Sequence, residues 1–341
     1  IATKSSRVCN AAQGDPVLEF GLRRAQGPEA GLYGAKAAII GGCKGTSNVL
    51  AGKLFNVPVS GTHAHSWVQK FDTELEAFRA YADIYPDSCL LLIDTYDVLN
   101  SGIKNAITVF NELRAKGHEP LGVRLDSGDL TYLSREVRRI LDEAGFENVK
   151  ITASNDLDEY TITSLKQEGA KIDSWGVGTK LITSYDYPSL GGVYKLAAAT
   201  NSEGLLVPKI KISENPEKIN NPGFKKVVRI YNENGKAEAD LIMLADEVID
   251  ESNTLEIFDP IYTCKTKKFE KYSLREVLSP LFKDGKCVRD KKTIQEVTEY
   301  TRQELASLWD QHKRIKNPHI YKVDLSEGLW KMKQDMIASK K

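Results

Sequence analysis

Between residues 57 and 200 the chain repeats one pattern, in which a short apolar run is followed by an amphipathic stretch. Successive runs begin about 23 to 32 residues apart, which is the length of one strand–helix unit. Consecutive units of this kind pair their strands in parallel with right-handed crossovers, so the rhythm predicts a parallel α/β sheet. The five runs are Val57–Val59, Cys89–Ile93, Leu121–Leu125, Val149–Ala153 and Lys171–Val177.

The number of units and the apolar character of both strand faces favour an irregular parallel α/β barrel, and an open doubly wound sheet is the alternative. Helical periodicity fills the intervals between the runs, and Gly117, Gly145 and Gly169 stand where helices often end on a left-handed residue. The helices are predicted over 73–85, 103–116, 132–144 and 159–168.

The chain divides into three predicted parts. Residues 1–56 read as a helical and loop lead-in that belongs to a split N-terminal domain, and residues 57–212 read as the barrel with the active site. Residues 213–341 read as a smaller α+β region, with short strands over 225–262, a turn at 232–235 and helices over 293–312 and 325–339.

Composition excludes several classes of partner. Lys plus Arg and Asp plus Glu both number 47, so the chain lacks the basic excess that a general nucleic-acid surface needs. No apolar run reaches the roughly 18 residues of a membrane span, and no signal peptide is visible. The five cysteines are odd in number and show no CxxC pair, which predicts a reducing cytoplasm rather than disulfides or a metal site.

Polar residues gather after the apolar runs, and in a barrel these positions converge on the catalytic face. At one strand end an Asp or Ser is most simply a helix cap, and Asp94, Ser127 and Asp158 can be explained in that way. Five consecutive strand ends that together carry His, Arg, Asp, Asn and Gly are harder to explain as caps. The motifs are Gly61–Ser66, Asp94–Asp97, Arg124–Asp129, Ser154–Asp156 and Gly176–Lys180.

These residue types suit a phosphorylated sugar. Arg124 and Asp126 share one strand face, where the guanidinium can bind an anion and the carboxylate can accept hydrogen bonds from a ribose, although a simple ion pair is the alternative. The glycine-rich turn through Gly178 and Thr179 can bind a phosphate through backbone N–H groups. His65 is favoured over His63 as the functional histidine, because one of the two is expected to be structural.

The motifs together resemble nicotinate phosphoribosyltransferases across the region from 18 to 196. Six ordered segments carry the resemblance: Leu18–Gly27, Gly45–Asn48, Gly61–Ser66, Gly122–Asp129, Gly176–Thr179 and Leu190–Leu196. The resemblance implies a type II phosphoribosyltransferase fold and conversion of nicotinate and phosphoribosyl pyrophosphate to nicotinate mononucleotide and pyrophosphate, a step of NAD salvage. It also implies coupling to hydrolysis of ATP with Mg²⁺, a cytoplasmic homodimer, and no metal held by protein side chains alone.

The resemblance also assigns residues. His65 matches the histidine that becomes phosphorylated, and Thr62, Arg23 and Arg124 match residues that contact nicotinate or the phosphoribosyl donor. Asp126 and Asn155 match positions at the ribose, and Gly178 and Thr179 match positions at the 5′-phosphate.

One difference from a related enzyme bears on the substrate, and one departure from the family pattern bears on activity. The nicotinamide enzyme of this fold carries an Asp where this chain has Ser47, so Ser47 indicates the acid rather than the amide. An N-terminal segment with an aromatic residue that stacks on the pyridine is expected in the family and is not found in this sequence. The alternatives are therefore a nicotinamide or quinolinate phosphoribosyltransferase, or a non-catalytic binding or regulatory fragment of the same fold.

Overall fold

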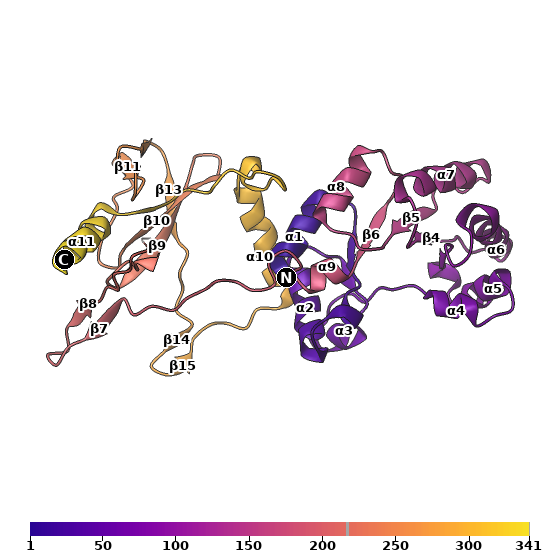
Figure 1. Ribbon diagram of the computed structural model, residues 1–341, viewed down its shortest axis with the longest axis horizontal. Coiled ribbons are helices and arrows are strands. Elements are labelled where there is room, and N and C mark those ends of the chain that lie inside the picture. Colours follow the sequence, from indigo (N-terminus) through magenta and orange to yellow (C-terminus); the bar gives the residue numbers. More distant parts are fainter. Residues whose placement is uncertain (216–217, 341) are drawn as a thin grey trace. The chain divides into compact units, whose positions relative to one another are not determined.

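The computed structural model describes residues 1–215 and 218–340, which are drawn in Figure 1. The chain forms two compact units. The first comprises Ile1–Ser189 and Lys292–Arg302, and the second comprises Leu190–Lys291 and Gln303–Lys341. Helix α10 (Ile294–Ser307) therefore contributes residues to both. None of the helices in the described ranges has the length and apolarity that a membrane crossing requires.

The first unit is built on a six-stranded sheet whose paired strands all run parallel, in the order β2-β1-β6-β5-β4-β3. Four of its strands lie within the predicted runs after residue 89. Two more, β1 and β2, come from the first 56 residues, which also contain α1 (Ala2–Ala11), α2 (Pro28–Ile40) and α3 (Val49–Phe55). The strands are β1 (Val17–Glu19), β2 (Gly45–Thr46), β3 (Leu90–Leu92), β4 (Gly122–Leu125), β5 (Lys150–Ala153) and β6 (Ser174–Val177).

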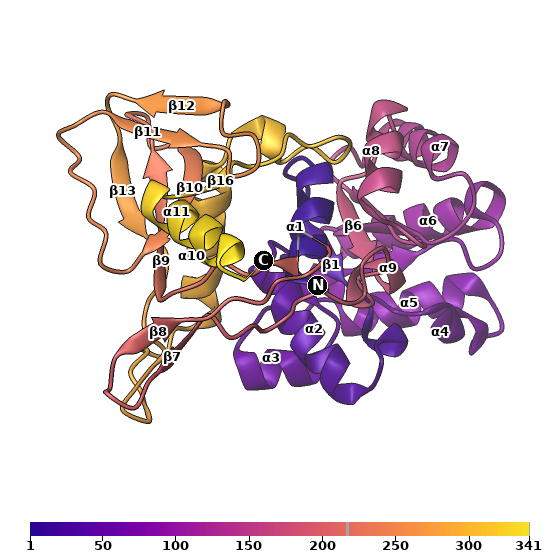
Figure 2. The same ribbon diagram turned by 60° about the vertical axis from the view of Figure 1, so that its left-hand side comes forward.

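Helices cover one face of this sheet (Figures 1 and 2). The four predicted helices are confirmed, and the three glycines beyond them have φ values of 87°, 78° and 77°. Side chains fix where the helices begin, because the Asp129 and Asp158 carboxylates accept the N–H groups of Tyr132 and Thr161. The helices are α5 (Glu74–Ile84), α6 (Ile103–Ala115), α7 (Leu130–Glu143) and α8 (Glu159–Gln167); shorter elements are η1 (Leu22–Arg24), α4 (His65–Gln69), η2 (Pro86–Ser88), η3 (Val98–Gly102) and α9 (Thr179–Ile182).

The two faces of the sheet differ in chemistry. The helix-covered face is buried and largely apolar, with Val123, Ile151 and Trp175 among its largest contributors. Alternate residues such as Arg124 and Thr152, which lie opposite each other in the register, point to the other face. The expectation that both strand faces are apolar is therefore wrong for the inner face, which carries the polar residues of the candidate site.

The segment from Val57 to His63 connects the two edges of the sheet. Its backbone bonds to β2, since the N–H groups of Thr46 and Ser60 donate to Pro58 and Thr46, so Val59 forms a single bridge rather than the predicted strand. At the opposite edge, the imidazole Nε2 of His63 accepts the N–H of Leu92 in β3 at 3.0 Å. The partial barrel is thus joined on one side by backbone bonds and on the other by one side chain.

The second unit contains a four-stranded sheet in the order β13-β9-β10-β16. The predicted turn joins β9 to β10, and Gly235 in that turn has a φ of 69°. The Arg229 guanidinium binds both carboxylate oxygens of Asp240 and also reaches Glu304. The elements are β7 (Ala198–Thr200), β8 (Leu206–Pro208), β9 (Lys225–Tyr231), β10 (Ala237–Leu244), β11 (Leu255–Phe258), β12 (Thr266–Phe269), β13 (Ser273–Glu276), β14 (Phe282–Lys283), β15 (Lys286–Cys287), η5 (Asp310–His312), β16 (Val323–Leu325) and α11 (Glu327–Ala338).

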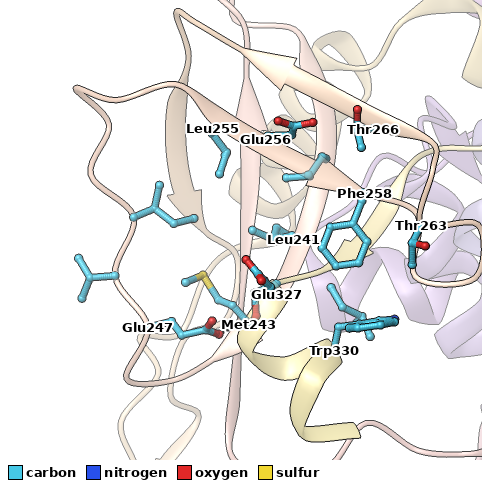
Figure 3. Close-up of a pocket in the computed structure, with 15 residues that line it drawn as sticks. Leu241, Met243, Glu247, Leu255, Glu256, Phe258, Thr263, Thr266, Glu327 and Trp330 are labelled. Atoms are coloured by element: carbon cyan, nitrogen blue, oxygen red, sulfur yellow. Dashed lines mark hydrogen bonds between the residues drawn. The ribbon is translucent and has the colours of Figure 1, made fainter. Parts of the chain in front are cut away.

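A cavity of about 560 Å³ lies in this unit between β10, the β11–β12 hairpin and α11 (Figure 3). Its floor is apolar, and the rings of Phe258 and Trp330 meet edge to face with their centroids 5.8 Å apart. The Trp330 indole N–H donates to the carbonyl of Pro260, which fixes the orientation of the ring. None of the predicted site residues lines this cavity.

Candidate active site

The predicted polar residues meet at one end of the six-stranded sheet. Because β3, β4, β5 and β6 run parallel, the residues that follow each strand emerge at the same end. Asp94 follows β3, Asp126 follows β4, Ser154 follows β5 and Gly178 follows β6.

Arg124 lies at the centre of this group, and each of its three guanidinium nitrogens donates a hydrogen bond. Its Nη1 donates to the Thr62 hydroxyl at 2.8 Å, its Nε donates to the Ser154 hydroxyl at 2.8 Å, and its Nη2 donates to the Asp126 carboxylate at 3.1 Å. Its Cζ lies 5.7 Å from the centre of the Phe20 ring. Three other segments and the neighbouring Asp126 therefore hold one cation in a single orientation, with its side chain 15% exposed.

Asp126 is held as firmly as Arg124. One of its carboxylate oxygens accepts both the Arg124 guanidinium and a short hydrogen bond from the Ser154 hydroxyl. The Ser154 hydroxyl thereby links the arginine and the carboxylate. The ion pair that was the alternative interpretation of these two residues is present, and it lies at a partly open position where a ligand can compete for it.

Gly176 in β6 leaves the space that the Phe20 ring fills. A Cβ at this position would lie 2.7 Å from the ring and 3.3 Å from the Cβ of Ser154. Any larger residue would displace the aromatic face beside Arg124. This close approach explains a glycine inside a strand, where it otherwise weakens pairing.

His65 begins α4 and is bound to a buried carboxylate. Its Nε2 lies 3.1 Å from Asp94, whose side chain is 1% exposed, whereas the His65 side chain is 39% exposed. The second Asp94 oxygen accepts the backbone N–H of Asp126 and the hydroxyl of Ser127. Asp94 therefore connects the histidine to the segment that carries Asp126.

Asp94 and Ser127 are not the helix caps that their positions suggested. Asp97 accepts the first N–H groups after β3, and Asp129 caps α7. Asp158 is a cap, as expected, and it also binds the Lys180 ammonium at 2.8 Å.

His63 has a structural environment. It is 7% exposed, it accepts the Leu92 N–H, and its ring packs edge-on against Tyr81 with centroids 4.7 Å apart. Burial, with smaller contributions from the nearby Arg124 and His65, lowers the pKa of His63 from its ordinary 6.5 to about 4. The neutral imidazole is therefore the form that the fold contains.

Arg23 and Ser47 lie at the carboxyl ends of β1 and β2. Arg23 belongs to η1, is exposed, and makes no hydrogen bond within the described ranges. Ser47 donates its backbone N–H to the Glu19 carbonyl, and its hydroxyl has no partner among the described residues. Both side chains are thus available to a ligand, and neither contacts Arg124.

Asn155, Gly178 and Thr179 occupy the ends of β5 and β6. Asn155 is exposed and has a φ of 100°, a strained conformation for a non-glycine residue that is typical of functional sites. Gly178 precedes α9, and Thr179 is the first residue of that short helix. Neither residue forms a hydrogen bond to Arg124 or His65 in the described ranges.

Comparison with known proteins decides the family. The model described as the nicotinate phosphoribosyltransferase (NAPRTase) family matches residues 16–252, and the model described as the nicotinate phosphoribosyltransferase C-terminal domain matches 224–333. The chain is 48% identical over 338 residues to the nicotinate phosphoribosyltransferase of Bacillus subtilis (strain 168), covering 99% of this chain and 68% of that protein. The chain belongs to the nicotinate phosphoribosyltransferase family.

Two further members of that family agree. The nicotinate phosphoribosyltransferase of Caenorhabditis elegans is 37% identical, with 97% of this chain and 68% of that protein aligned. The crystal structure of human nicotinic acid phosphoribosyltransferase superposes with a TM-score of 0.80 at 28% identity, covering 98% of this chain and 73% of that chain. This superposition confirms the predicted fold class, a partial parallel α/β barrel with a smaller separate region.

A cavity of about 1090 Å³ opens on the inner face of the six-stranded sheet. Phe20, Thr62 and His63 line the end nearest to Arg124, and Trp67 and Tyr85 line one wall. The cavity continues along the strands to their amino ends, where its lining includes Pro16, Leu121, Lys150 and Asp173. It is large enough for a small aromatic ligand.

Three residues of the site were not predicted from the sequence. Phe20 was part of a motif but was given no role. Asp94 was most simply explained as a cap, and Ser154 was only part of a polar strand end. Ser154 and Phe20 share a signal, since each directly follows its strand and lies two residues after an inner-face residue, Thr152 or Leu18. Asp94 had no such signal, because the sequence does not show which carboxylate of Asp94–Asp97 caps the helix.

No group of three or more His, Cys, Asp or Glu side chains within residues 1–215 and 218–340 is arranged to hold a metal ion. The five cysteines are all free thiols. Cys9 and Cys43 face each other, whereas Cys264 and Cys287 are exposed.

Proposed function

We propose that this protein transfers the phosphoribosyl group of phosphoribosyl pyrophosphate to nicotinate, releasing nicotinate mononucleotide and pyrophosphate as a step of NAD salvage. The pyridine nitrogen bonds to the anomeric carbon of the ribose, and the bond from that carbon to pyrophosphate breaks with its electrons on the departing oxygen. Family membership supports the reaction. The observation that carries it is the Arg124 guanidinium, whose three nitrogens each donate a hydrogen bond and whose partner Thr62 lines an aromatic-walled cavity.

Arg124 suits the charges of this reaction. Nicotinate, phosphoribosyl pyrophosphate and the leaving group are all anions, and a preorganised cation in a partly enclosed site stabilises developing negative charge without reorganising. The contacts to Thr62, Ser154 and Asp126 fix the guanidinium before substrate arrives. Asp126 keeps a second carboxylate oxygen that can accept a ribose hydroxyl.

Asn155, Gly178 and Thr179 are proposed to hold the rest of the donor. Asn155 would hydrogen-bond the ribose, and the strained backbone at its position supports a binding role. Gly178 and Thr179 would hold the 5′-phosphate through N–H groups that begin a helix and have no intrahelical acceptor. Arg23 and Ser47 would face the nicotinate or the donor, since both are unoccupied by partners in the described structure.

His65 is proposed to couple the reaction to ATP. With the proton of the ring on Nε2 and donated to Asp94, the Nδ1 lone pair is free to attack the γ-phosphorus of ATP. The phosphorus–oxygen bond to ADP breaks and its electrons stay on ADP. The phosphohistidine would then be hydrolysed to phosphate, and the buried Asp94 carboxylate would stabilise the imidazolium character of the ring throughout.

A phosphoryl group on His65 would add about −1.5 to −2 charges close to the bonds of Asp94 and Asp126. Because Asp94 also holds the Asp126 backbone and the Ser127 hydroxyl, a change at His65 reaches the donor-binding segment directly. Mg²⁺ would arrive with the phosphates and be held mainly by their oxygens, with one carboxylate such as Asp126 as a protein ligand. It would neutralise charge on those phosphates.

Ser47 supports nicotinate over nicotinamide. A neutral hydroxyl accepts or donates a hydrogen bond without repelling a carboxylate, whereas an Asp at this position would repel the acid and favour the amide. Quinolinate carries a second carboxylate and would call for further cations in the cavity lining. Lys150 is the one cationic side chain among the residues that line it, and it lies at the amino end of β5.

A labelling experiment tests the proposal. The purified protein is incubated with phosphoribosyl pyrophosphate, Mg²⁺ and labelled nicotinate, nicotinamide or quinolinate, with and without ATP. We expect labelled mononucleotide from nicotinate, formed faster with ATP. Product from nicotinamide or quinolinate alone would overturn the substrate, and no product from any of them, despite binding of the donor, would leave a non-catalytic binding module.

Two histidine variants test the coupling. His65→Ala is expected to lose acid-labile label from γ-labelled ATP and to lose the stimulation by ATP. His118→Ala is the matched control, because His118 also pairs with a carboxylate, Asp87, at 2.7 Å on the outer surface. Full ATP-stimulated turnover by His65→Ala would refute the phosphohistidine.

Two further properties rest on the family resemblance, and each has its own measurement. The protein is proposed to be a homodimer, which light scattering after size-exclusion chromatography would test. It is proposed to act in the cytoplasm, in agreement with its five free thiols, and subcellular fractionation would test that location.

A further inference from the structure

Glu19 is a buried carboxylate beneath the strand ends of the candidate site. It is the last residue of β1, and it is 0% exposed. Burial raises the pKa of Glu19, while hydrogen bonds from Thr46 and Gly21 act in the opposite direction. It forms no ion pair within the described ranges, so its environment is unusual for an acidic residue.

The two carboxylate oxygens of Glu19 bind two different loops. One oxygen accepts a short hydrogen bond from the backbone N–H of Gly21, the residue that precedes η1. The other accepts the Thr46 hydroxyl at 2.6 Å. The Thr46 hydroxyl in turn accepts the backbone N–H of Asn48 at 3.0 Å, so the bonds extend across Ser47.

The loops that Glu19 joins carry two residues of the proposed nicotinate site. Arg23 lies in η1, two residues after Gly21, and Ser47 lies between Thr46 and Asn48. The Glu19 backbone adds a third bond, since its carbonyl accepts the Ser47 N–H at 3.0 Å. Neither the Arg23 nor the Ser47 side chain has a partner in the described ranges, so the bonds of Glu19 add to the β1–β2 pairing in fixing the two loops relative to each other.

Glu19 does not touch the substrate itself. Leu18 and Phe20, its neighbours along the strand, line the cavity, and alternation directs the Glu19 side chain to the opposite face of the sheet. None of the residues that line the cavity forms a hydrogen bond with the Glu19 carboxylate in the described structure. Any effect of Glu19 on catalysis must therefore pass through the loops.

We infer that Glu19 is a positioning residue that sets the distance between Arg23 and Ser47 and thereby the preference for a carboxylate over a carboxamide on the pyridine ring. This inference rests on the proposed function. A single carboxylate that accepts from both loops holds them in one arrangement, whereas an amide can accept with its oxygen only and offers donors to the second loop.

Glu19→Gln tests the inference, because it keeps the size of the side chain. We expect the KM for nicotinate to rise about tenfold, the change that loss of one hydrogen bond to a charged group produces, with kcat reduced less. The ratio of kcat/KM for nicotinate to that for nicotinamide is expected to fall. Thr46→Val should produce the same change, and the double variant should be no worse than either single variant, because both remove one connection.

Glu74→Gln is the matched control. Glu74 is another buried carboxylate of the same unit, and it accepts the Ser101 hydroxyl and the Asn105 amide away from both loops. This variant is expected to lower stability while leaving KM and the nicotinate preference unchanged. A purely structural role for Glu19 would make Glu19→Gln behave in the same way.

Hydrogen exchange gives a readout that does not depend on transferase activity. In Glu19→Gln the backbone amides of residues 21–24 and 46–48 should exchange faster, whereas in Glu74→Gln they should not. Faster exchange with unchanged KM and preference would overturn the positioning role, and unchanged exchange would overturn the connection itself. If the unmodified protein makes no nicotinate mononucleotide, the proposed function fails and the exchange result still decides whether Glu19 holds the two loops.

Discussion

Replacing His63 with a residue that cannot titrate should change how the free energy of unfolding depends on pH. His63 joins segment 57–63 to β3 through the bond from the Leu92 N–H to Nε2, which requires an unprotonated ring nitrogen. In the unfolded chain this histidine has an ordinary pKa of 6.5, and in the folded chain burial lowers the pKa to about 4. Between these values the unfolded state binds a proton that the folded state does not, so stability falls as the pH is lowered.

The size of the effect follows from the two pKa values. A difference from 6.5 to about 4 corresponds to about 3 kcal/mol of stability that is present above pH 6.5 and lost by pH 4. His63→Gln cannot titrate, and its side-chain oxygen can still accept the Leu92 N–H. At pH 7 the variant should be less stable by about 1–2 kcal/mol because the ring contact with Tyr81 is lost. At pH 4 the variant should be the more stable of the two.

Urea unfolding measures this difference. Replacing Trp309 and Trp330 with Phe in both proteins restricts the fluorescence signal to Trp67 and Trp175 of the first unit. Carboxylates elsewhere titrate equally in both proteins, so only the difference between their unfolding free energies is compared. Parallel curves from pH 7 to pH 4 would refute the assignment of a buried, neutral His63.

Three further changes probe other parts of the same unit. Gly176→Ala should cost about 1–3 kcal/mol and raise the KM for nicotinate, because its methyl group would displace the Phe20 ring; calorimetry and steady-state kinetics check this, and wild-type values for both would contradict it. Arg124→Lys should lower kcat/KM about 10²- to 10³-fold, since an ammonium cannot make three directed contacts, and near-normal turnover would show that charge alone suffices. Thr73→Ala removes the capping box with Glu76 and should cost about 1 kcal/mol in thermal unfolding with no change in KM.

Local signals were sufficient for the strands and helices between residues 89 and 177. Each apolar run is followed by an amphipathic helix and a glycine in the left-handed region, so propensity, periodicity and turn chemistry agree. The strands β1 and β2 were not predicted, because they are three and two residues long and thus too short to show a period. Their pairing with β6 and with residue 59 joins segments far apart in the sequence, which no local pattern encodes.

The sequence predicted which charged residues lie together at the candidate site, but it did not predict the hydrogen bonds that join them. Arg124 and Asp126 were found because a strand alternates, and alternation fixes which side chains share a face. Ser154 completes their bond network from a neighbouring strand, and the parallel register that brings it there is set by the whole sheet. Asp94 was misread for a related reason, since its partners His65, Asp126 and Ser127 come from other strand ends.

The two histidines of one hexapeptide act at the same junction in different ways. His63 points to the sheet edge and joins it to β3, and two residues later His65 begins α4 and binds Asp94, which follows β3 by two residues. The segment from 63 to 65 is therefore attached to one strand end at two points, one buried and one open to solvent. A phosphoryl group on His65 would disturb only the solvent-exposed bond to Asp94. The buried bond from Leu92 to His63 would keep the backbone of the hexapeptide in place. If His65 is phosphorylated as proposed, this arrangement would let its charge change while the bond from Leu92 to His63 still holds the edge of the sheet.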